Sequence, residues 1–382
     1  MIIPVGITLI VIVIGYYCIY SLIIRILANR KMPHQPMASR FTPFLSIVIP
    51  TYNESKMIEK RIRNFDSLDY PSGQFEVIFV DGASTDGTPE LVERLRADHR
   101  SFIRLVRQSA RQGYNSAIYE GVCQARSDII VTAEVGALFE EKALRSIVGQ
   151  LTRPGVGVAT GKSVLYNPDE SFASRLEAAY RRTHDMLRYA ESRVDSTPDM
   201  KGELLCFRKE IGLKLRPGEG LSDTVAFDMA VSYMARRMGW RAIFDPESIF
   251  HEYAPTVMRD RLIVQIRRGT TFAGAVLAFR SMIFNPDFGY FGLLIAPSRL
   301  LMLLIFPWVL LIASVILTIE SLWNPWPAVV ILAMACVALL LKKTRYTFLS
   351  FILSQVVLAI ASLRLALHKE TRMINTVPTA RR

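Results

Sequence analysis

The sequence predicts an α/β domain with a mostly parallel sheet, held between apolar segments that are long enough to cross a membrane. Between residues 44 and 256, short apolar runs alternate with amphipathic stretches, which is the pattern of repeated strand–helix–strand units. Nearly uninterrupted apolar runs lie toward the two ends of the chain. Hydrophobic residues therefore make up 51% of the 382 residues, and the mean hydropathy is +0.26.

The first apolar run, residues 2–27, can cross a hydrocarbon core of roughly 30 Å at about 1.5 Å per helical residue. Arg30 and Lys31 follow this run, whereas a cleaved signal peptide has basic residues before a shorter one. We therefore expect an uncleaved transmembrane anchor over residues 1–30, with the chain after it in the cytoplasm. Three prolines indicate a linker over residues 31–43.

The central segment begins with four short apolar runs separated by amphipathic stretches. The expected strands are residues 45–49, 75–80, 103–107 and 128–132. The expected helices between them are residues 56–68, 89–97 and 117–125. Thr88 and Pro89 suit the cap and the first turn of the second helix. This alternation indicates a parallel sheet with helices on its faces.

Arginines and large apolar side chains mix over residues 257–290, which predicts amphipathic helices at a membrane surface. Apolar segments then fill residues 291–367, and a basic tail covers residues 368–382. The three segments are residues 291–319, 326–341 and 346–367, and the middle one is short for a span. If all three of these segments crossed the membrane, the basic tail would lie outside, against the positive-inside rule. The sequence therefore leaves open that one of the three segments lies in the interface.

The net charge of +12 has two explanations, which are nucleic-acid binding and the clustering of basic residues near anionic lipid. No nucleic-acid-binding motif occurs in the sequence. We therefore expect membrane lipids, and no nucleic acid, among the partners. The apolar segments lack carboxylates apart from Glu320 near an edge, which argues against a transporter.

Polar clusters follow the expected strands, where parallel sheets bind their ligands. They cover residues 50–54, 80–88, 111–115 and 134–136. Each cluster alone also fits an ordinary turn. Asp81 lies at a strand tip, where its carboxylate can accept hydrogen bonds from a base or ribose. Arg111 and the backbone amides after it suit a diphosphate at a helix N-terminus.

The run SIVIPTYNE at residues 46–54, followed at this distance by the cluster 80–88, resembles the family-2 inverting glycosyltransferases, whose fold is called GT-A. The resemblance covers about residues 45–285, and the flanking apolar segments look like those of the membrane-bound polysaccharide-synthase branch. It implies a cytoplasmic GT-A domain over residues 44–256. The nucleotide-sugar site that it implies comprises Thr51, Glu54, Asp81, Arg111, Gly113 and Glu134.

Downstream segments match the acceptor side of the family. Gly202 lies in a segment that looks like the acceptor-side glycine segment. The family carries its catalytic carboxylate at a helix start about three turns before a glycine, and counting back from Gly239 selects Asp228 as the general base. Asp223 is the competing carboxylate, whose alternative role is to start the helix favourably.

Gln265 and Arg268 match the family's Gln-x-x-Arg-Trp motif, which lines the acceptor channel and contacts the donor diphosphate. Gly269 stands where tryptophan is usual, which weakens the expectation of an aromatic platform under the acceptor sugar. The alternative is that Arg267 and Arg268 only contact lipid headgroups.

The family's metal motif, Asp-x-Asp at the end of the fourth strand, reads Glu134-Val135-Gly136 here. We therefore expect weak Mg²⁺ or Mn²⁺ binding through Glu134, completed by diphosphate and water. Tyr114 also stands where the family usually has lysine. These departures motivate an alternative, which is a catalytically silent homologue that binds nucleotide-sugar or assembles with an active partner.

The resemblance as a whole implies transfer of a sugar, with inversion, from a nucleotide-diphospho-sugar that we expect to be UDP-linked. The implied acceptor is a polysaccharide or a lipid-linked molecule, and the implied location is the cell membrane. Interfacial helices and several spans suit both acceptors, because each keeps an acceptor at the bilayer.

Overall fold

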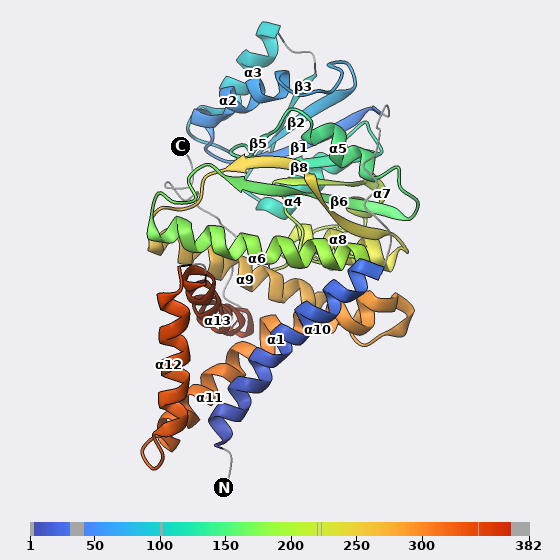
Figure 1. Ribbon diagram of the computed structural model, residues 1–382. Coiled ribbons are helices and arrows are strands. Elements are labelled where there is room, and N and C mark those ends of the chain that lie inside the picture. Colours follow the sequence, from blue (N-terminus) through green and yellow to red (C-terminus); the bar gives the residue numbers. More distant parts are fainter. Residues whose placement is uncertain are drawn as a thin grey trace.

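The structure is a computed structural model that describes residues 4–30, 42–99, 102–219, 221–222, 224–342 and 344–367. An α/β domain occupies one end of the molecule, and apolar helices occupy the other (Figure 1). Two long helices, α6 (Phe172–Val194) and α9 (Met258–Ala278), run across the boundary between these two parts. Most of the expected linker, the expected tail and Asp223 lie outside the described residues.

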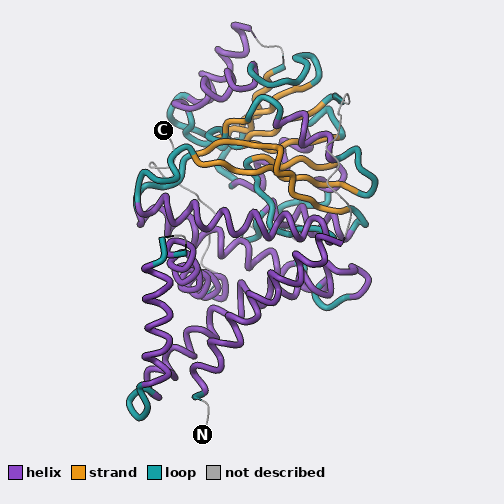
Figure 2. Tube along the Cα trace, viewed as in Figure 1, coloured by secondary structure: helices purple, strands orange, loops and turns teal. Residues whose placement is uncertain are grey.

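One eight-stranded sheet forms the centre of the α/β domain, with the strand order β3-β2-β1-β4-β7-β6-β8-β5. All of its strands lie in the part of the molecule away from the apolar helices (Figure 2). The strands are β1 (Leu45–Thr51), β2 (Phe75–Asp81), β3 (Ile103–Arg107), β4 (Ile129–Ala133), β5 (Leu138–Phe139), β6 (Val156–Leu165), β7 (Leu204–Arg208) and β8 (Arg241–Glu252). The predicted parallel arrangement of β3, β2, β1 and β4 is confirmed, so their carboxyl ends meet at one edge.

Helices cover both faces of the sheet because its strands are apolar on both sides. These helices are α2 (Ser55–Asp66), α3 (Thr88–His99), α4 (Tyr114–Gln124), α5 (Ala143–Gln150), α7 (Lys209–Leu213) and α8 (Phe227–Arg237). The core on one face joins Ile47 of β1 to Ile58 of α2. The core on the other face continues from Val48 of β1 to Ile24 of the first apolar helix. One continuous core therefore joins the α/β domain to the apolar helices.

Three helices are long and apolar enough to cross a membrane, which are Val5–Asn29, Phe291–Glu320 and Arg345–Ala366. The first of these is most of α1 (Val5–Arg30), and the second contains α10 (Ala296–Leu300) and α11 (Phe306–Glu320). Between the second and third lies α12 (Trp326–Leu340), which is the short apolar segment that the sequence predicts. Apolar helices at both ends of the chain are thus confirmed.

The last helix, α13 (Arg345–Ala366), differs in direction from the other apolar helices. In Figure 1, α1, α11 and α12 run away from the α/β domain, whereas α13 is seen nearly end-on beneath α9. Its main contacts are with α9 and α6. A Cβ at Gly269 of α9 would lie 3.0 Å from the Ala361 Cβ and 3.3 Å from the Leu358 Cδ2. An indole would not fit there, so the departure from the family's tryptophan has a packing cause.

A buried ion pair also ties the apolar helices to the α/β domain. Glu191 of α6 is fully buried and accepts two hydrogen bonds, of 2.8 and 2.7 Å, from the Arg299 guanidinium in α10. The Tyr20 hydroxyl of α1 donates a third, of 2.6 Å, to the same carboxylate. Three elements that are distant in sequence therefore share one buried charge.

Candidate active site

The turns after β1 and β2 are fastened to each other by hydrogen bonds. The Asn53 backbone N–H donates to the Ser84 hydroxyl at 2.9 Å, and the Thr85 N–H donates to the Asn53 Oδ1 at 2.9 Å. The Ser55 N–H donates to the Asp86 carboxylate at 3.0 Å. Asn53 is left-handed, with φ of 54°, a conformation that asparagine tolerates better than most residues. The polar clusters of the sequence are thus brought together at the carboxyl edge of the sheet.

A cavity opens at this edge, and we call it the strand-end cavity. From the turns it is lined by Thr51, Tyr52, Glu54, Gly82, Arg111, Gly113 and Glu134, and from the opposite side by Glu177, Arg181, Glu252, Arg261, Arg267 and Arg268. The Arg111 guanidinium stacks 3.7 Å above the ring centre of Tyr52. Gly113 precedes α4 with φ of 92°, which a residue with a side chain adopts only under strain. Five of the six predicted nucleotide-sugar residues therefore line one cavity.

The sixth, Asp81, lies beside this cavity but does not line it. It is 2% exposed, and its carboxylate accepts hydrogen bonds from the Ser84 backbone N–H at 3.0 Å and the Ser84 hydroxyl at 2.6 Å. Each carboxylate oxygen can accept a further hydrogen bond. Contact between Asp81 and a base or ribose therefore stays a prediction.

A second cavity adjoins the first, and we call it the Asp228 cavity. Its lining includes Asp228, Arg188, Lys201, Gly202 and Glu203. It shares Tyr114, Glu134, Arg181, Arg267 and Arg268 with the strand-end cavity. A molecule in one cavity can therefore approach a molecule in the other along these shared side chains.

Asp228 lies in the first turn of α8. Its Oδ1 accepts a hydrogen bond of 2.8 Å from the Met229 N–H. Burial, together with the nearby Glu203 carboxylate, raises the pKa of Asp228 to about 7. A carboxyl group with such a pKa is suited to accept a proton near neutral pH.

Gly202 lines the Asp228 cavity beside Tyr114, which lines both cavities. A Cβ there would lie 2.9 Å from the Tyr114 hydroxyl and 4.0 Å from the Asp228 Cβ. The absence of a side chain at Gly202 thus leaves room for Tyr114, which occupies the position of the family's lysine. Burial and the carboxylates of Glu134 and Asp228 raise the pKa of Tyr114 well above its usual value, so its hydroxyl stays neutral.

Ion pairs between α6 and α9 form the wall opposite the turns. The Glu177 carboxylate lies 3.1 Å from Arg181, 3.3 Å from Arg261 and 3.6 Å from Arg268. Burial alone would raise the pKa of Glu177, but Arg181, Arg268 and Arg261 hold it at about 2. Arg181 also pairs with Glu252 at the end of β8.

The two residues predicted from the Gln-x-x-Arg-Trp motif, Gln265 and Arg268, have different surroundings in this network. Arg268 lines both cavities and lies 3.2 Å from Glu203. Gln265 is buried, donates at 3.4 Å to Glu177 and lines neither cavity. Arg267 lines both cavities, and its guanidinium makes no hydrogen bond or ion pair with any residue in the described part of the chain.

Sequence reasoning missed Glu177, Arg181 and Glu252. Glu177 and Arg181 are spaced as an ordinary surface pair on a helix, and only the packing of α9 over them shows that they are buried. Glu252 ends a strand, as Glu134 follows one, and that placement was the available signal.

The residues around Glu134 fit weak binding of a hard cation. Burial and the carboxylates of Glu203 and Glu252 raise the pKa of Glu134 to about 8. The charged form of Glu134 is therefore disfavoured, and a bound cation would offset that cost. Within the described ranges, no group of three or more acidic, histidine or cysteine side chains could hold a metal. Glu134 alone would need diphosphate oxygens and water to complete a shell. A Cβ at Gly136 would meet no atom within 4 Å.

The sheet and the cavity at its carboxyl edge define a glycosyltransferase of the GT-A fold. The chain belongs to glycosyl transferase family group 2, whose family model matches residues 137–342. The model of glycosyl transferase family 2 matches residues 46–211. The predicted family and the GT-A fold are therefore confirmed, and the protein is an enzyme.

Among solved structures, the chain is similar to the mannosyltransferase PcManGT from Pyrobaculum calidifontis in complex with GDP-Man and Mn²⁺. The TM-score is 0.77 at 28% sequence identity, and the match covers 96% of this chain and 99% of that one. Among curated proteins, it is 29% identical over 139 residues to the beta-monoglucosyldiacylglycerol synthase of a Nostoc species, which is 36% of this chain and 30% of the relative. It is 22% identical over 203 residues to the poly-beta-1,6-N-acetyl-D-glucosamine synthase of Staphylococcus aureus, which is 53% of this chain and 48% of the relative. The match thus spans less than half the length of either curated relative.

Proposed function

We propose that this enzyme transfers a sugar, with inversion, from a nucleotide-diphospho-sugar in the strand-end cavity to an acceptor hydroxyl in the Asp228 cavity. The position of Asp228 carries the proposal, because this half-buried carboxyl group, with a pKa of about 7, lines the Asp228 cavity, which shares side chains with the strand-end cavity. The acceptor is a lipid-linked molecule or a polysaccharide, as in the names of the curated relatives.

In this reaction Asp228 takes the proton of the acceptor hydroxyl. The freed oxygen forms a bond to the anomeric carbon while the bond from that carbon to the diphosphate breaks. Because attack and departure occur on opposite faces of the sugar, the configuration inverts. The nucleoside diphosphate leaves with the bonding electron pair.

Cationic side chains offset the charge that develops on the departing diphosphate. Arg267 is suited to this role, because it lines both cavities and has no ion-pair partner among the residues that the structure describes. Arg268 is already paired with Glu203 and Glu177, so it also holds the wall in place. A Mg²⁺ or Mn²⁺ ion at Glu134 would, when bound, neutralise part of the diphosphate charge.

We place the protein in a membrane with α1, Phe291–Glu320 and α12 crossing and α13 lying along the interface. The support is the direction of α13, which runs across the other apolar helices beneath α9 (Figure 1). In this arrangement, Phe291–Glu320 leaves the cytoplasmic side and α12 returns to it. The basic tail and the catalytic domain then lie on the same, cytoplasmic side, as the positive-inside rule favours. Labelling a cysteine introduced near residue 375 in sealed vesicles tests this, because a tail on the opposite side from the catalytic domain would contradict it.

The donor is tested by incubating the full-length protein in detergent with GDP-mannose and a set of UDP-sugars. GDP-mannose is included because the Pyrobaculum calidifontis enzyme binds it, and UDP-sugars are the expectation from sequence. We expect release of nucleoside diphosphate and label in a lipid or polymer fraction, both lost in Asp228→Asn. Absence of release with every donor would contradict the proposed function.

A further inference from the structure

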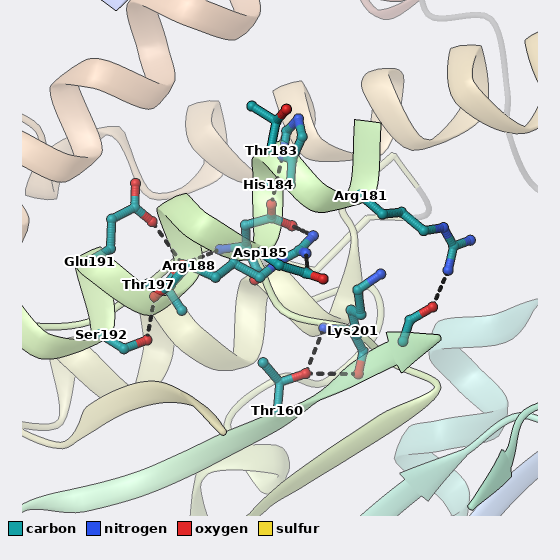
Figure 3. Close-up of polar contacts among 12 residues, drawn as sticks. Thr160, Arg181, Thr183, His184, Asp185, Arg188, Glu191, Ser192, Thr197 and Lys201 are labelled. Atoms are coloured by element: carbon teal, nitrogen blue, oxygen red, sulfur yellow. Dashed lines mark hydrogen bonds and ion pairs between the residues drawn. The ribbon is translucent and has the colours of Figure 1, made fainter. Parts of the chain in front are cut away.

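Lys201 is a buried cation that the proposed reaction does not use. Its side chain is 6% exposed and lines the Asp228 cavity but not the strand-end cavity. Thr160 fixes its backbone, since the Lys201 N–H donates to the Thr160 hydroxyl at 2.9 Å and the hydroxyl donates to the Lys201 carbonyl at 3.2 Å (Figure 3). The Lys201 ammonium makes no hydrogen bond or ion pair with any residue that the structure describes.

Neighbouring buried cations differ from Lys201 in this respect. Arg188 lies 2.9 Å from Asp199 and 2.6 Å from Asp185, and Arg181 pairs with Glu177 and Glu252. In Figure 3 dashed lines join Arg188 to the carboxylates beside it, whereas no dashed line reaches the end of the Lys201 side chain. The Lys201 ammonium therefore depends on the contents of the cavity that Lys201 lines for its hydrogen bonds.

The electrostatics favour an anion beside Lys201. Burial and the positive charges of Arg181 and Arg188 lower the pKa of Lys201 to about 8, so the ammonium remains mostly charged at neutral pH. Among the cations that line the Asp228 cavity, Arg181, Arg188 and Arg268 are already paired with carboxylates. This leaves the Lys201 ammonium and the Arg267 guanidinium without an ion-pair partner among the described residues. The carboxyl groups in the same lining are those of Glu134, Glu203 and Asp228. Two of those three carboxyl groups have pKa values raised to about 7 or 8. The cavity therefore favours an anionic occupant.

We propose that Lys201 binds a phosphate group of the acceptor, and that the acceptor is a sugar joined to a lipid through phosphate. This inference rests on the proposed function, because Asp228 still deprotonates a sugar hydroxyl. A phosphate oxygen is already ionised and needs no general base, so the phosphate acts as the recognition group and the hydroxyl as the nucleophile. Lys201 lies next to Gly202, and a Cβ at Gly202 would lie 4.0 Å from the Asp228 Cβ. The phosphate that Lys201 binds and the hydroxyl that Asp228 deprotonates can therefore belong to one short headgroup.

The donor's own diphosphate is a less suitable ligand for Lys201. The strand-end cavity has its own cations in Arg111, Arg261 and Arg267, and Lys201 is absent from its lining. A lipid link suits the location, because α6 and α9 both line the Asp228 cavity. These two helices lie between the sheet and the apolar helices (Figure 1).

The test measures lipid binding to the full-length protein in neutral detergent micelles, with farnesyl phosphate and farnesol as probes and no sugar donor. We expect wild-type protein to bind the phosphate at least about tenfold more tightly than the alcohol, the size of one charge-assisted hydrogen bond. Lys201→Met should remove this preference, and Lys201→Arg should keep most of it. Lys60→Met, an exposed position on α2, serves as the matched control and should change nothing.

Equal binding of the two probes by wild-type protein overturns the proposal without any variant. A preference that survives in folded Lys201→Met also overturns it. Loss of GDP or UDP affinity in Lys201→Met, with the lipid preference intact, would assign Lys201 to the donor instead. Because no donor is present, an enzyme that turns over no nucleotide-sugar can still show the lipid preference. Failure of the inference is thus separate from failure of the proposed function.

Discussion

The two walls of the strand-end cavity are held in place by different forces. On one wall, the turns follow consecutive strands and are fastened by hydrogen bonds such as Asn53 to Ser84. The opposite wall comes from α6 and α9, whose buried arginines share the Glu177 carboxylate. The first wall thus depends on local backbone geometry, whereas the second depends on correct packing of distant helices.

This difference has an energetic consequence. One turn hydrogen bond contributes about 1 kcal/mol, so a turn can lose one and keep its shape. Removing one partner from a buried ion pair leaves an uncompensated charge, which costs about 3–5 kcal/mol. Substitutions on the two sides should therefore fail in different ways, through lost affinity on one side and lost chemistry or stability on the other.

The largest effect is expected from Asp228→Asn. The amide keeps the size of the side chain but cannot take a proton, so transfer should fall by about two to four orders of magnitude. Radiolabelled sugar transfer measures this, and calorimetry with a nucleoside diphosphate should show that donor-side binding persists. If Asp228→Asn remains active and Asp223→Asn is inactive, the base is Asp223.

Glu177→Gln tests whether the ion pairs between α6 and α9 hold their wall of the strand-end cavity. Arg181, Arg261 and Arg268 lose their shared anion, and the free energy of unfolding should fall by about 3 kcal/mol or more. Denaturant melts in detergent measure this loss. Glu59→Gln, in an exposed pair with Arg63 on α2, is the matched control and should leave the melt unchanged. Equal melts for the two variants would show that the network is not structural.

The pH dependence of transfer reports the base directly. Asp228 acts only when it is deprotonated, and its pKa is raised to about 7. The value of kcat/KM should therefore fall about tenfold per pH unit below pH 7 and level off above it. Melting curves over the same range control for unfolding. A rate that is constant from pH 5 to pH 8 would exclude Asp228 as a base with this pKa.

Asp81→Ala tests the strand-end cavity, where we expect affinity for a nucleoside diphosphate to fall about tenfold, roughly the cost of a lost charged partner. Ser84→Ala is the matched control, since it removes the hydroxyl that Asp81 binds and keeps the carboxylate. Calorimetry on both variants separates two roles. If Ser84→Ala lowers the affinity as much as Asp81→Ala does, Asp81 acts only through the turn.

The smallest effect is expected at the metal. Wild-type protein should bind Mn²⁺ weakly alone and more tightly with nucleoside diphosphate, because Glu134 is the only carboxylate that its strand-end motif offers. Gly136→Asp should tighten binding severalfold, since φ at Gly136 is not in the left-handed region and a Cβ meets open space. Manganese titration with and without GDP measures both. Tight binding by the wild type without nucleotide would show that another ligand exists.

The same contrast explains what could be predicted from sequence. The parallel strands and the turns at Thr51, Glu54 and Gly113 follow from local patterns, and the structure brings them to one cavity. Glu177 and Arg181 could not be predicted, because their spacing on α6 looks like a surface pair until α9 packs over it. The motif also predicts Gln265 in the acceptor channel, and this stays a prediction. The sequence did not indicate that Gln265 is buried against Glu177. The glycine at position 269 is explained only by packing, because Ala361 of α13 lies beside it.

The buried contact among Glu191, Arg299 and Tyr20 has a consequence for which acceptors can reach Asp228. Because α1, α6 and α10 share this charge, the catalytic domain cannot tilt or lift relative to the apolar helices without exposing it. With those helices in a bilayer, the distance from the membrane surface to Asp228 is therefore fixed. The enzyme would then select acceptors by the distance between the membrane surface and the reacting hydroxyl.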